Sequence, residues 1–183
     1  MRITGGKYVR RQVVCPPGEI RPAMDRMRES LFSILGDLTG CSFLDLFSGS
    51  GCVAIEAASR GADPIHLVEL DRGKKAVIEK NLSYVEESHR LFTMDVMRFL
   101  TVSGLKYSVV YADPPFSMEG KTEILRLASE SKAVKDTGLF IIHLPREDRK
   151  LWEEKMYGFT LEDERHYGRS FLLFYRPEVD EKC

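Results

Sequence analysis

Metal-binding and disulfide patterns are missing from this chain of 183 residues. Its four cysteines, Cys15, Cys41, Cys52 and Cys183, are scattered, and no two of them form a C-x-x-C pair. The four histidines are equally dispersed and have no metal-ligand spacing. Disulfide frameworks and zinc sites need closely spaced ligands, so we expect neither. The pattern favours a protein of the reducing cytoplasm that binds no metal.

Long hydrophobic segments are also absent. No apolar run approaches the ~20 residues that a membrane-spanning helix needs. The first six residues, MRITGG, do not resemble a signal peptide. Hydrophobic residues make up 43% and charged residues 30% of the chain, which is ordinary for a soluble globular protein. The length predicts a single domain over residues 1–183 with room for a full core.

The chain as a whole has no large excess of positive or negative charge, because its net charge is -1. The charge is nevertheless uneven, because residues 1–30 hold seven basic against three acidic side chains, a balance of +4. A basic segment on a neutral body is typical of phosphate contact, although a solvated surface gives the same pattern. We expect residues 1–22 to form a basic, extended arm that is flexible at Gly5-Gly6. Its candidate phosphate ligands, with the helix start that follows, are Arg2, Lys7, Arg10, Arg11, Arg21, Arg26 and Arg28.

The hydrophobic pattern predicts alternating strands and helices. Strands are expected over residues 42–47, 65–70, 90–94, 107–112 and 138–144, and helices over 24–36, 52–60, 73–86, 95–100, 121–132 and 148–156. Two further strands, 159–165 and 170–175, form a hairpin around Tyr167-Gly168. This order predicts an α/β fold, a Rossmann-like doubly wound sheet of seven strands. The sheet is mostly parallel, and its C-terminal hairpin is antiparallel.

The most informative motif is Asp113-Pro114-Pro115-Phe116, which directly follows the apolar strand 107–112. Open α/β sheets bind ligands at the carboxyl ends of their strands. Asp113 and a backbone carbonyl of the Asp-Pro segment can accept both N–H bonds of a nucleobase amine, which aims the nitrogen lone pair at an incoming methyl group. Phe116 offers a face on which a flipped base can stack, and the prolines hold the acceptors in place. A simple strand-ending turn is the alternative.

A glycine-rich loop, D-L-F-S-G-S-G from Asp45 to Gly51, joins the first strand to a helix. Gly49 and Gly51 allow the backbone to approach a ligand closely. Glu69 ends the second strand 20 residues after Gly49, the spacing at which an acid meets ribose hydroxyls in nucleotide-binding folds. Gly49-x-Gly51-x-x-Ala54 also matches a dinucleotide fingerprint, so the loop alone leaves NAD open.

Three acidic residues favour S-adenosylmethionine over NAD. Asp45 lies four residues before Gly49, inside a strand, where dinucleotide sites usually have an apolar residue. Asp95 follows the third strand and is placed to accept from an adenine amine. With Glu69 and Asp113 it would line one crevice of a doubly wound sheet. Each acid alone is typical of a helix cap or turn, but the ordered set indicates a methyltransferase.

The order of D-L-F-S-G-S-G, V-E-L-D, M-D and D-P-P-F resembles class I S-adenosylmethionine-dependent amino-methyltransferases. The N-terminal stretches R-I-T-G-G and R-P-A-M-D-R-M-R-E-S-L-F narrow the resemblance to the RsmD family, which methylates guanine N2 of small-subunit ribosomal RNA. It runs from Arg2 to the hairpin at 167–170. Two departures are visible: Tyr8-Val9-Arg10-Arg11 stands where the family has W-R-G-R, and Ala23 where it has threonine. Both concern the arm and leave the methyl-transfer core intact.

This resemblance implies S-adenosylmethionine as cofactor and small-subunit ribosomal RNA, free or in an assembled ribonucleoprotein, as partner. The implied catalytic residues are Asp113, Pro114, Pro115 and Phe116. The implied cofactor-binding residues are Asp45, Phe47, Ser48, Gly49, Gly51, Glu69, Leu70, Asp95 and Val96.

Two other enzymatic functions remain open at this point. An adenine-N6 or cytosine-N4 DNA amino-methyltransferase would use the same turn, but 183 residues leave little room for a sequence-reading domain. An NAD-dependent oxidoreductase is disfavoured by the Asp-Pro-Pro-Phe motif.

Overall fold

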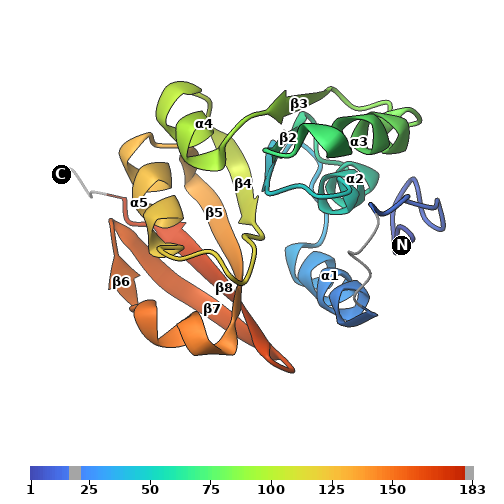
Figure 1. Cartoon of the computed structure of the whole chain (residues 1–183). Coiled ribbons are helices and arrows are strands. Elements are labelled where there is room, and N and C mark those ends of the chain that lie inside the picture. Colours follow the sequence, from blue (N-terminus) through green and yellow to red (C-terminus); the bar gives the residue numbers. More distant parts are fainter. Residues whose placement is uncertain (17–21, 180–183) are drawn as a thin grey trace. The chain divides into compact units, whose positions relative to one another are not determined.

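The computed structural model describes residues 1–16 and 22–179, and the chain divides into two compact units, Met1–Asp95 and Val96–Cys183 (Figure 1). Each unit is described by itself. The single domain expected from the length stays a prediction. Among the described residues, no helix is both long and apolar enough to cross a membrane. Within the same part of the chain, no group of His, Cys, Asp and Glu side chains is arranged to hold a metal ion.

The first unit contains a parallel sheet in the order β3-β2-β1. Its strands are β1 (Phe43–Leu46), β2 (Ile65–Glu69) and β3 (His89–Thr93). All four residues of β1 are buried, as the sequence predicted for a core strand. The register pairs Leu46 with Val68 and Glu69 with Thr93, so the carboxyl ends of the three strands lie side by side.

The helices of the first unit follow the predicted order. They are α1 (Pro22–Leu35), α2 (Cys52–Ser59), the 3-10 helix η1 (Arg72–Lys74) and α3 (Lys75–Leu82). Helix α2 is almost entirely buried because its alanines allow close packing against β1 and β2. The expected helix over 73–86 is shorter in the structure and ends at Leu82.

Residues 1–14 are folded back on themselves rather than extended. Arg2 and Gln12 form an antiparallel bridge, and the N–H of Val13 donates to the carbonyl of Met1 at 2.9 Å. Gly5-Gly6 allows close packing of the backbone and does not act as a hinge. A Cβ on Gly6 would lie 1.8 Å from the carbonyl oxygen of Ser59, so only glycine allows the segment to rest on the end of α2.

The second unit contains strands in the order β4-β5-β8-β7-β6. They are β4 (Tyr107–Ala112), β5 (Val134–Pro145), β8 (Ser170–Pro177), β7 (Phe159–Tyr167) and β6 (Lys155–Met156). Strands β4 and β5 are parallel, whereas β5 pairs with β8 in antiparallel orientation, as expected for a terminal hairpin. The long hairpin β7–β8 is drawn in orange and red in Figure 1. The unit's helices are α4 (Val96–Val102), α5 (Thr122–Glu130) and the 3-10 helix η2 (Arg146–Leu151).

The predicted helix over 148–156 is wrong. The 3-10 helix η2 ends at Leu151, and the chain then becomes extended so that the indole of Trp152 packs 5.8 Å from the ring of Tyr175. Tyr157 and Gly158, both with positive φ, turn the short strand β6 into β7. Tertiary packing of one large aromatic ring outweighs the weak helix propensity of a short charged segment. Strand β6 is also why the described residues hold eight strands instead of seven.

Candidate functional site

The glycine-rich loop between β1 and α2 is strongly curled. Phe47, Gly49 and Gly51 have φ of 64°, 58° and 79°, in the left-handed region. The N–H of Ser48 donates to the carbonyl of Val68 at 3.0 Å, which holds the loop against β2. The φ of 79° at Gly51 is one that residues with a Cβ rarely adopt, and a Cβ there would also lie 3.1 Å from a methyl carbon of Leu67, so the position favours glycine. Curled backbone of this kind forms a concave wall that suits a nucleotide-like ligand.

Glu69 fastens this loop from the end of β2. Its Oε2 accepts from the N–H of Gly49 at 2.8 Å, and its Oε1 accepts from the N–H of Asp71 at 2.9 Å. A carboxylate has about four lone-pair sites, so both oxygens keep capacity for ribose hydroxyls. The structure therefore brings Gly49 and Glu69 together, as their spacing suggested, and adds a bracing role to Glu69.

Asp45 lies beneath the loop and not on its surface. Its side chain is 1% exposed, and its Oδ2 accepts from the N–H of Ala54 at 3.2 Å. This bond satisfies an N–H of the first turn of α2, where helices leave donors without intrahelical partners. The contact between Asp45 and a cofactor stays a prediction; what the structure places there is a brace for the helix that follows the glycines.

The remaining cofactor candidates lie near the ends of β2 and β3. Leu70 is 64% exposed directly after Glu69, an unusual position for a large apolar side chain. Asp95 is exposed two residues after Thr93, the strand partner of Glu69. Val96 is buried as the first residue of α4. An exposed leucine beside an acid is the arrangement in which an adenine ring finds an apolar face and an acceptor for its amine.

In the second unit, Asp113 is held by a histidine. Strands β4 and β5 pair Ala112 with Ile142, so the next residue of each strand, Asp113 and His143, are neighbours. The Nδ1 atom of His143 lies 2.9 Å from Oδ1 of Asp113. The ring of Phe116 lies 5.2 Å from the His143 ring, centroid to centroid, at 60°. Asp113 and Phe116 thus both contact His143. Nothing in the sequence indicated this, because His143 lies 30 residues after Asp113.

Lys121 fixes the rest of the Asp-Pro-Pro-Phe loop. Its buried ammonium donates to the carbonyl of Phe116 at 2.9 Å, to that of Met118 at 2.5 Å and to Oδ2 of Asp148 at 2.6 Å. All three of its N–H donors are used. A cavity of about 250 Å³ adjoins the loop, lined by Phe116, Ser117, Met118, Glu119, Gly120, Lys121, Thr122, Asp148, Leu151 and Trp152. From the sequence, Lys121 was predicted only to begin the helix over 121–132.

The predicted phosphate ligands differ in their surroundings. Four of them are exposed: Arg2, Arg10, Arg11 and Arg26. Lys7 is exposed but paired, with its ammonium 2.6 Å from Glu86 and 3.3 Å from Glu87. The hydrogen bond to Glu86 raises the pKa of Lys7 above its usual value, so it stays charged. Arg21 lies outside the described residues.

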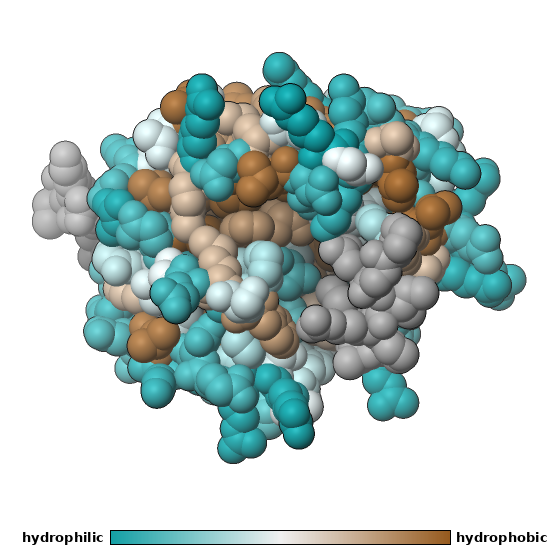
Figure 2. Space-filling model, in the orientation of Figure 1, coloured by the Kyte–Doolittle hydropathy of each residue, from teal (hydrophilic) through white to brown (hydrophobic). Residues whose placement is uncertain are grey.

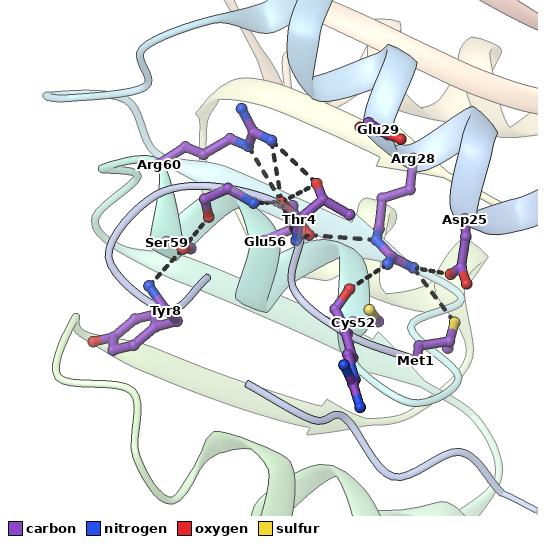
Figure 3. Close-up of polar contacts among 12 residues, drawn as sticks. Met1, Thr4, Tyr8, Asp25, Arg28, Glu29, Cys52, Glu56, Ser59 and Arg60 are labelled. Atoms are coloured by element: carbon purple, nitrogen blue, oxygen red, sulfur yellow. Dashed lines mark hydrogen bonds and ion pairs between the residues drawn. The ribbon is translucent and has the colours of Figure 1, made fainter. Parts of the chain in front are cut away.

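Arg28 is engaged inside the first unit (Figure 3). It is 3% exposed, and its guanidinium donates to the carbonyl of Arg2 at 2.6 Å. It also lies 3.0 Å from Oδ1 of Asp25 and 3.4 Å from Oε2 of Glu56. Its contact with RNA remains a prediction, but the contacts present hold the N-terminal segment against α1 and α2. Beside it is a cavity of about 610 Å³, lined by Met1, Arg2, Thr4, Gln12, Val13, Val14, Asp25, Arg26, Arg28 and Glu29.

Glu56 is the centre of that network. The carboxylate is fully buried and accepts from the N–H and hydroxyl of Thr4, at 2.9 Å and 2.7 Å, and from the N–H of Gly5 at 3.0 Å. Figure 3 shows it between these groups and the guanidinium of Arg60, which lies 3.3 Å away. A buried charge is stable only when it is paired and hydrogen-bonded, and Glu56 meets both conditions. In the sequence, Glu56 is simply one residue of the predicted helix over 52–60.

Asn81 of α3 joins the N-terminal segment to the glycine-rich loop. Its side-chain nitrogen donates to the carbonyls of Val14 at 2.8 Å and Ser50 at 2.9 Å. Its oxygen accepts from the N–H of Val14 at 2.9 Å. The side chain is buried, the bond to Ser50 is buried and those to Val14 are partly buried, so Asn81 ties both segments to α3.

Several large hydrophobic side chains are exposed, among them those of Val9 and Val14 in the N-terminal segment. The face shown in Figure 2 is mostly hydrophilic, with hydrophobic side chains in small groups. Besides Leu70, Leu151 is 55% exposed and lines the cavity beside the Asp-Pro-Pro-Phe loop. Isolated exposed apolar residues are common, but these two adjoin the two candidate binding regions.

Comparison with known proteins supports one family over residues 1–176. The model of the family described as Conserved hypothetical protein 95 matches residues 1–176. The Ribosomal RNA small subunit methyltransferase D of Escherichia coli K12 is 34% identical over 146 residues, 78% of this chain and 73% of that protein. The protein of the same name from Haemophilus influenzae is 27% identical over 175 residues, 92% of this chain and 89% of that protein.

Solved structures agree with the sequence comparisons. The Escherichia coli protein yhhF superimposes with a TM-score of 0.87 at 27% identity over 98% of this chain and 99% of that one. The hypothetical protein TTHA0928 of Thermus thermophilus gives a TM-score of 0.79 at 28% identity, covering 96% and 99%. These matches confirm the predicted Rossmann-like fold, which has eight strands in place of seven. With a family model over residues 1–176 and a relative of 34% identity, the chain belongs to the family described as Conserved hypothetical protein 95, and its resemblance to the RsmD methyltransferases is confirmed.

Proposed function

We propose that this protein transfers a methyl group from S-adenosylmethionine to the exocyclic N2 amine of a guanine in small-subunit ribosomal RNA. The observation that carries the proposal is Asp113, at the carboxyl end of β4. Its Oδ1 is bound to His143, while its Oδ2 has no hydrogen-bond or ion-pair partner among the described residues. One oxygen is thus fixed by the protein and the other is left for a ligand. The relatives named as ribosomal RNA methyltransferases support RNA as the substrate class.

The residues of the first unit fit the proposed cofactor. The loop is curled where a Cβ on Gly51 would crowd Leu67, and Glu69 holds the N–H of Gly49 while keeping lone pairs for a ribose. When bound, S-adenosylmethionine supplies an electrophilic methyl group on a positively charged sulfur. The residues that would hold it, directly or by shaping the loop, are Asp45, Phe47, Ser48, Gly49, Gly51, Glu69, Leu70, Asp95 and Val96.

Asp113 and one nearby carbonyl would hold the target amine. The carbonyl of Pro115 accepts from the N–H of Met118, and that of Phe116 accepts from Lys121. The carbonyls of Asp113 and Pro114 are the first candidates for the second acceptor, because those of Pro115 and Phe116 each have one lone pair already engaged. A carboxylate stabilises the positive charge that develops on the base nitrogen. Fixed geometry supplies a further part of the rate, because the amine is oriented before it reacts.

Phe116 would support the base itself. Its ring is backed by His143 and its carbonyl is fixed by Lys121, so both ends of the residue are positioned. Stacking on an aromatic face is tolerant of base identity, so the choice of guanine has to come from contacts with the edge of the base. The cavity beside Phe116, Leu151 and Trp152 is the space next to this ring.

RNA phosphates would contact the exposed cations of the N-terminal region. Arg2, Arg10, Arg11 and Arg26 are accessible in the structure, whereas Lys7 would exchange Glu86 and Glu87 for a phosphate. Arg28 would act by holding this region in place. Phosphate contacts position a protein on RNA without reading sequence, so presentation of the base by a folded RNA or an assembled subunit would supply the remaining selectivity.

Methyl transfer from tritium-labelled S-adenosylmethionine tests the proposal. Free small-subunit ribosomal RNA, assembled small subunits and duplex DNA are offered side by side, and labelled product is digested to nucleosides. We expect label in N2-methylguanosine from one of the two RNA substrates and none from DNA. Label in DNA alone, or as N6-methyladenosine, would contradict the proposed substrate. A protein that binds S-adenosylmethionine but labels none of the three would contradict the proposed reaction.

A further inference from the structure

His143 is the one buried titratable side chain that touches both Asp113 and Phe116 within the described residues of the second unit. It is 5% exposed, on the last part of β5. Its Nδ1 faces Oδ1 of Asp113 at 2.9 Å, and the ring of Phe116 covers it at 5.2 Å. Its Nε2 is buried and has no hydrogen-bond partner among the described residues. These facts constrain where the imidazole carries its proton.

Asp113 as a carboxylate can only accept, so Nδ1 of His143 has to carry a hydrogen for this contact to be a hydrogen bond. A neutral imidazole protonated at Nδ1 then leaves only a lone pair at Nε2. The contact with Asp113 therefore places a hydrogen on Nδ1 and fixes the orientation of the ring, while the buried Nε2 has no hydrogen-bond partner among the described residues.

We propose that His143 is a positioning residue for methyl transfer, acting through Asp113, and this rests on the proposed function. Its Nδ1–H commits one carboxylate oxygen of Asp113 and thereby presents Oδ2 to the target amine. The same ring also packs against Phe116, but the proposed role depends on the Nδ1–H donor. His143 itself does not contact substrate. Positioning hydrogen bonds of this kind fix orientation and stabilise the charged form of the acid they hold.

A histidine that merely fills the interior is the competing explanation, and matched variants separate the two. His143→Asn keeps an N–H donor near the position of Nδ1 but removes the ring. His143→Leu keeps a comparable apolar volume but removes the donor. His143→Gln carries its amide one carbon further out, nearer the position of Nε2. If His143 only fills the interior, kcat should depend on whether the variant keeps the side-chain volume. If His143 positions Asp113, kcat should depend on whether the variant keeps the N–H donor.

We expect His143→Leu and His143→Gln to lower kcat by about 10- to 100-fold, the effect of losing a hydrogen bond to a charged group. The KM for S-adenosylmethionine should stay unchanged, because its proposed ligands other than Val96 belong to the first unit. His143→Asn should recover most of the lost kcat. A His143→Leu enzyme with parental kcat would overturn the proposal. So would Asn and Leu variants that lose kcat equally, since the ring and not the donor would then matter.

Nitrogen-15 NMR of the histidine-labelled, substrate-free protein provides a test that needs no activity. We expect His143 to show a protonated Nδ1, and the signal of this nitrogen to shift in Asp113→Ala. A proton on Nε2 with a bare Nδ1 would overturn the proposal, even if the variants proved too unstable to assay. Failure of the parental protein to methylate RNA would instead refute the proposed function and leave the NMR result standing.

Discussion

At the scale of single residues, the two acids assigned to cofactor and base have different environments. Glu69 accepts backbone N–H donors from Gly49 and Asp71 on its two oxygens, whereas Asp113 has one partner, His143, and one open oxygen within the part of the chain that the structure describes. The first arrangement suits a residue that shapes a pocket wall and binds hydroxyls. The second suits a residue that engages a reacting group. We therefore expect substitutions at Glu69 and Asp113 to affect different steps, cofactor binding and methyl transfer respectively.

Removal of the carboxylate at Asp113 should abolish transfer and spare cofactor binding. The acid is assigned to the base amine, so Asp113→Ala loses the acceptor for its N–H and the charge that stabilises the developing cation. Labelled methyl transfer and calorimetric binding of S-adenosylmethionine measure the two properties separately. An active Asp113→Ala enzyme, or one that has lost cofactor binding alone, would contradict the assigned role.

Substitution of Glu69 should instead weaken the binding of S-adenosylmethionine. Glu69→Ala removes the proposed ribose acceptor and releases the N–H of Gly49, so binding of S-adenosylmethionine should weaken by roughly 1.5–3 kcal/mol, the range for hydrogen bonds to charged groups. Glu69→Gln, which keeps one acceptor oxygen, should lose less. Calorimetry checks both, with thermal unfolding as the control for folding. Parental affinity in a folded Glu69→Ala protein would remove Glu69 from the cofactor site.

At the scale of elements, the buried ammonium of Lys121 is one of the groups that hold the loop after β4. Lys121 neutralises Asp148 and satisfies two loop carbonyls, so Lys121→Met leaves all three acceptors without their donor. The free energy of unfolding should fall by about 1–3 kcal/mol, the cost of unsatisfied buried polar groups. Chemical denaturation measures it. The exposed Lys150, mutated to methionine, is the matched control and should change stability by less than ~0.5 kcal/mol. Equal effects of the two substitutions would refute the role of Lys121.

The sequence predicted elements whose signal is local and missed features that depend on distant partners. Strand β4 lies over residues 107–112 as expected, because a buried apolar run bounded by turn residues has few alternatives. The segment after η2 was misassigned because its conformation is decided by where Trp152 finds Tyr175. His143, Lys121 and Glu56 were missed for the same reason. Their partners lie up to 52 residues away and share no periodic pattern with them.

At the scale of the whole molecule, the distribution of charge determines which surface would contact the phosphates of RNA. Exposed cations gather in the first 30 residues of a chain whose net charge is -1. Because residues 1–14 fold back on the first unit, these cations are carried by a defined surface and not by a loose tail. The order of the N-terminal segment reduces the entropy lost on binding RNA.

Salt dependence of RNA binding tests this surface. Alanine at Arg2, Lys7, Arg10 and Arg11 together should weaken binding to RNA of any sequence. It should also flatten the slope of log affinity against log salt by just under one unit for each lost contact. Cofactor affinity should be retained. Arg28→Ala is the contrasting variant: it breaks the contacts with Arg2, Asp25 and Glu56 and should lower stability more than it changes the slope. A parental slope in the quadruple variant would make the segment an ordinary solvated surface.

The bridge made by Asn81 has a consequence for the order in which the protein is assembled. The first residues leave the ribosome long before their anchor, because Val14 lies 67 residues upstream of Asn81. The carbonyl of Ser50 lies 31 residues upstream of the same amide. None of the three bonds exists until α3 has been synthesised. The bonds from Asn81 to the glycine-rich loop and to the N-terminal segment can therefore form only after most of the first unit has been translated.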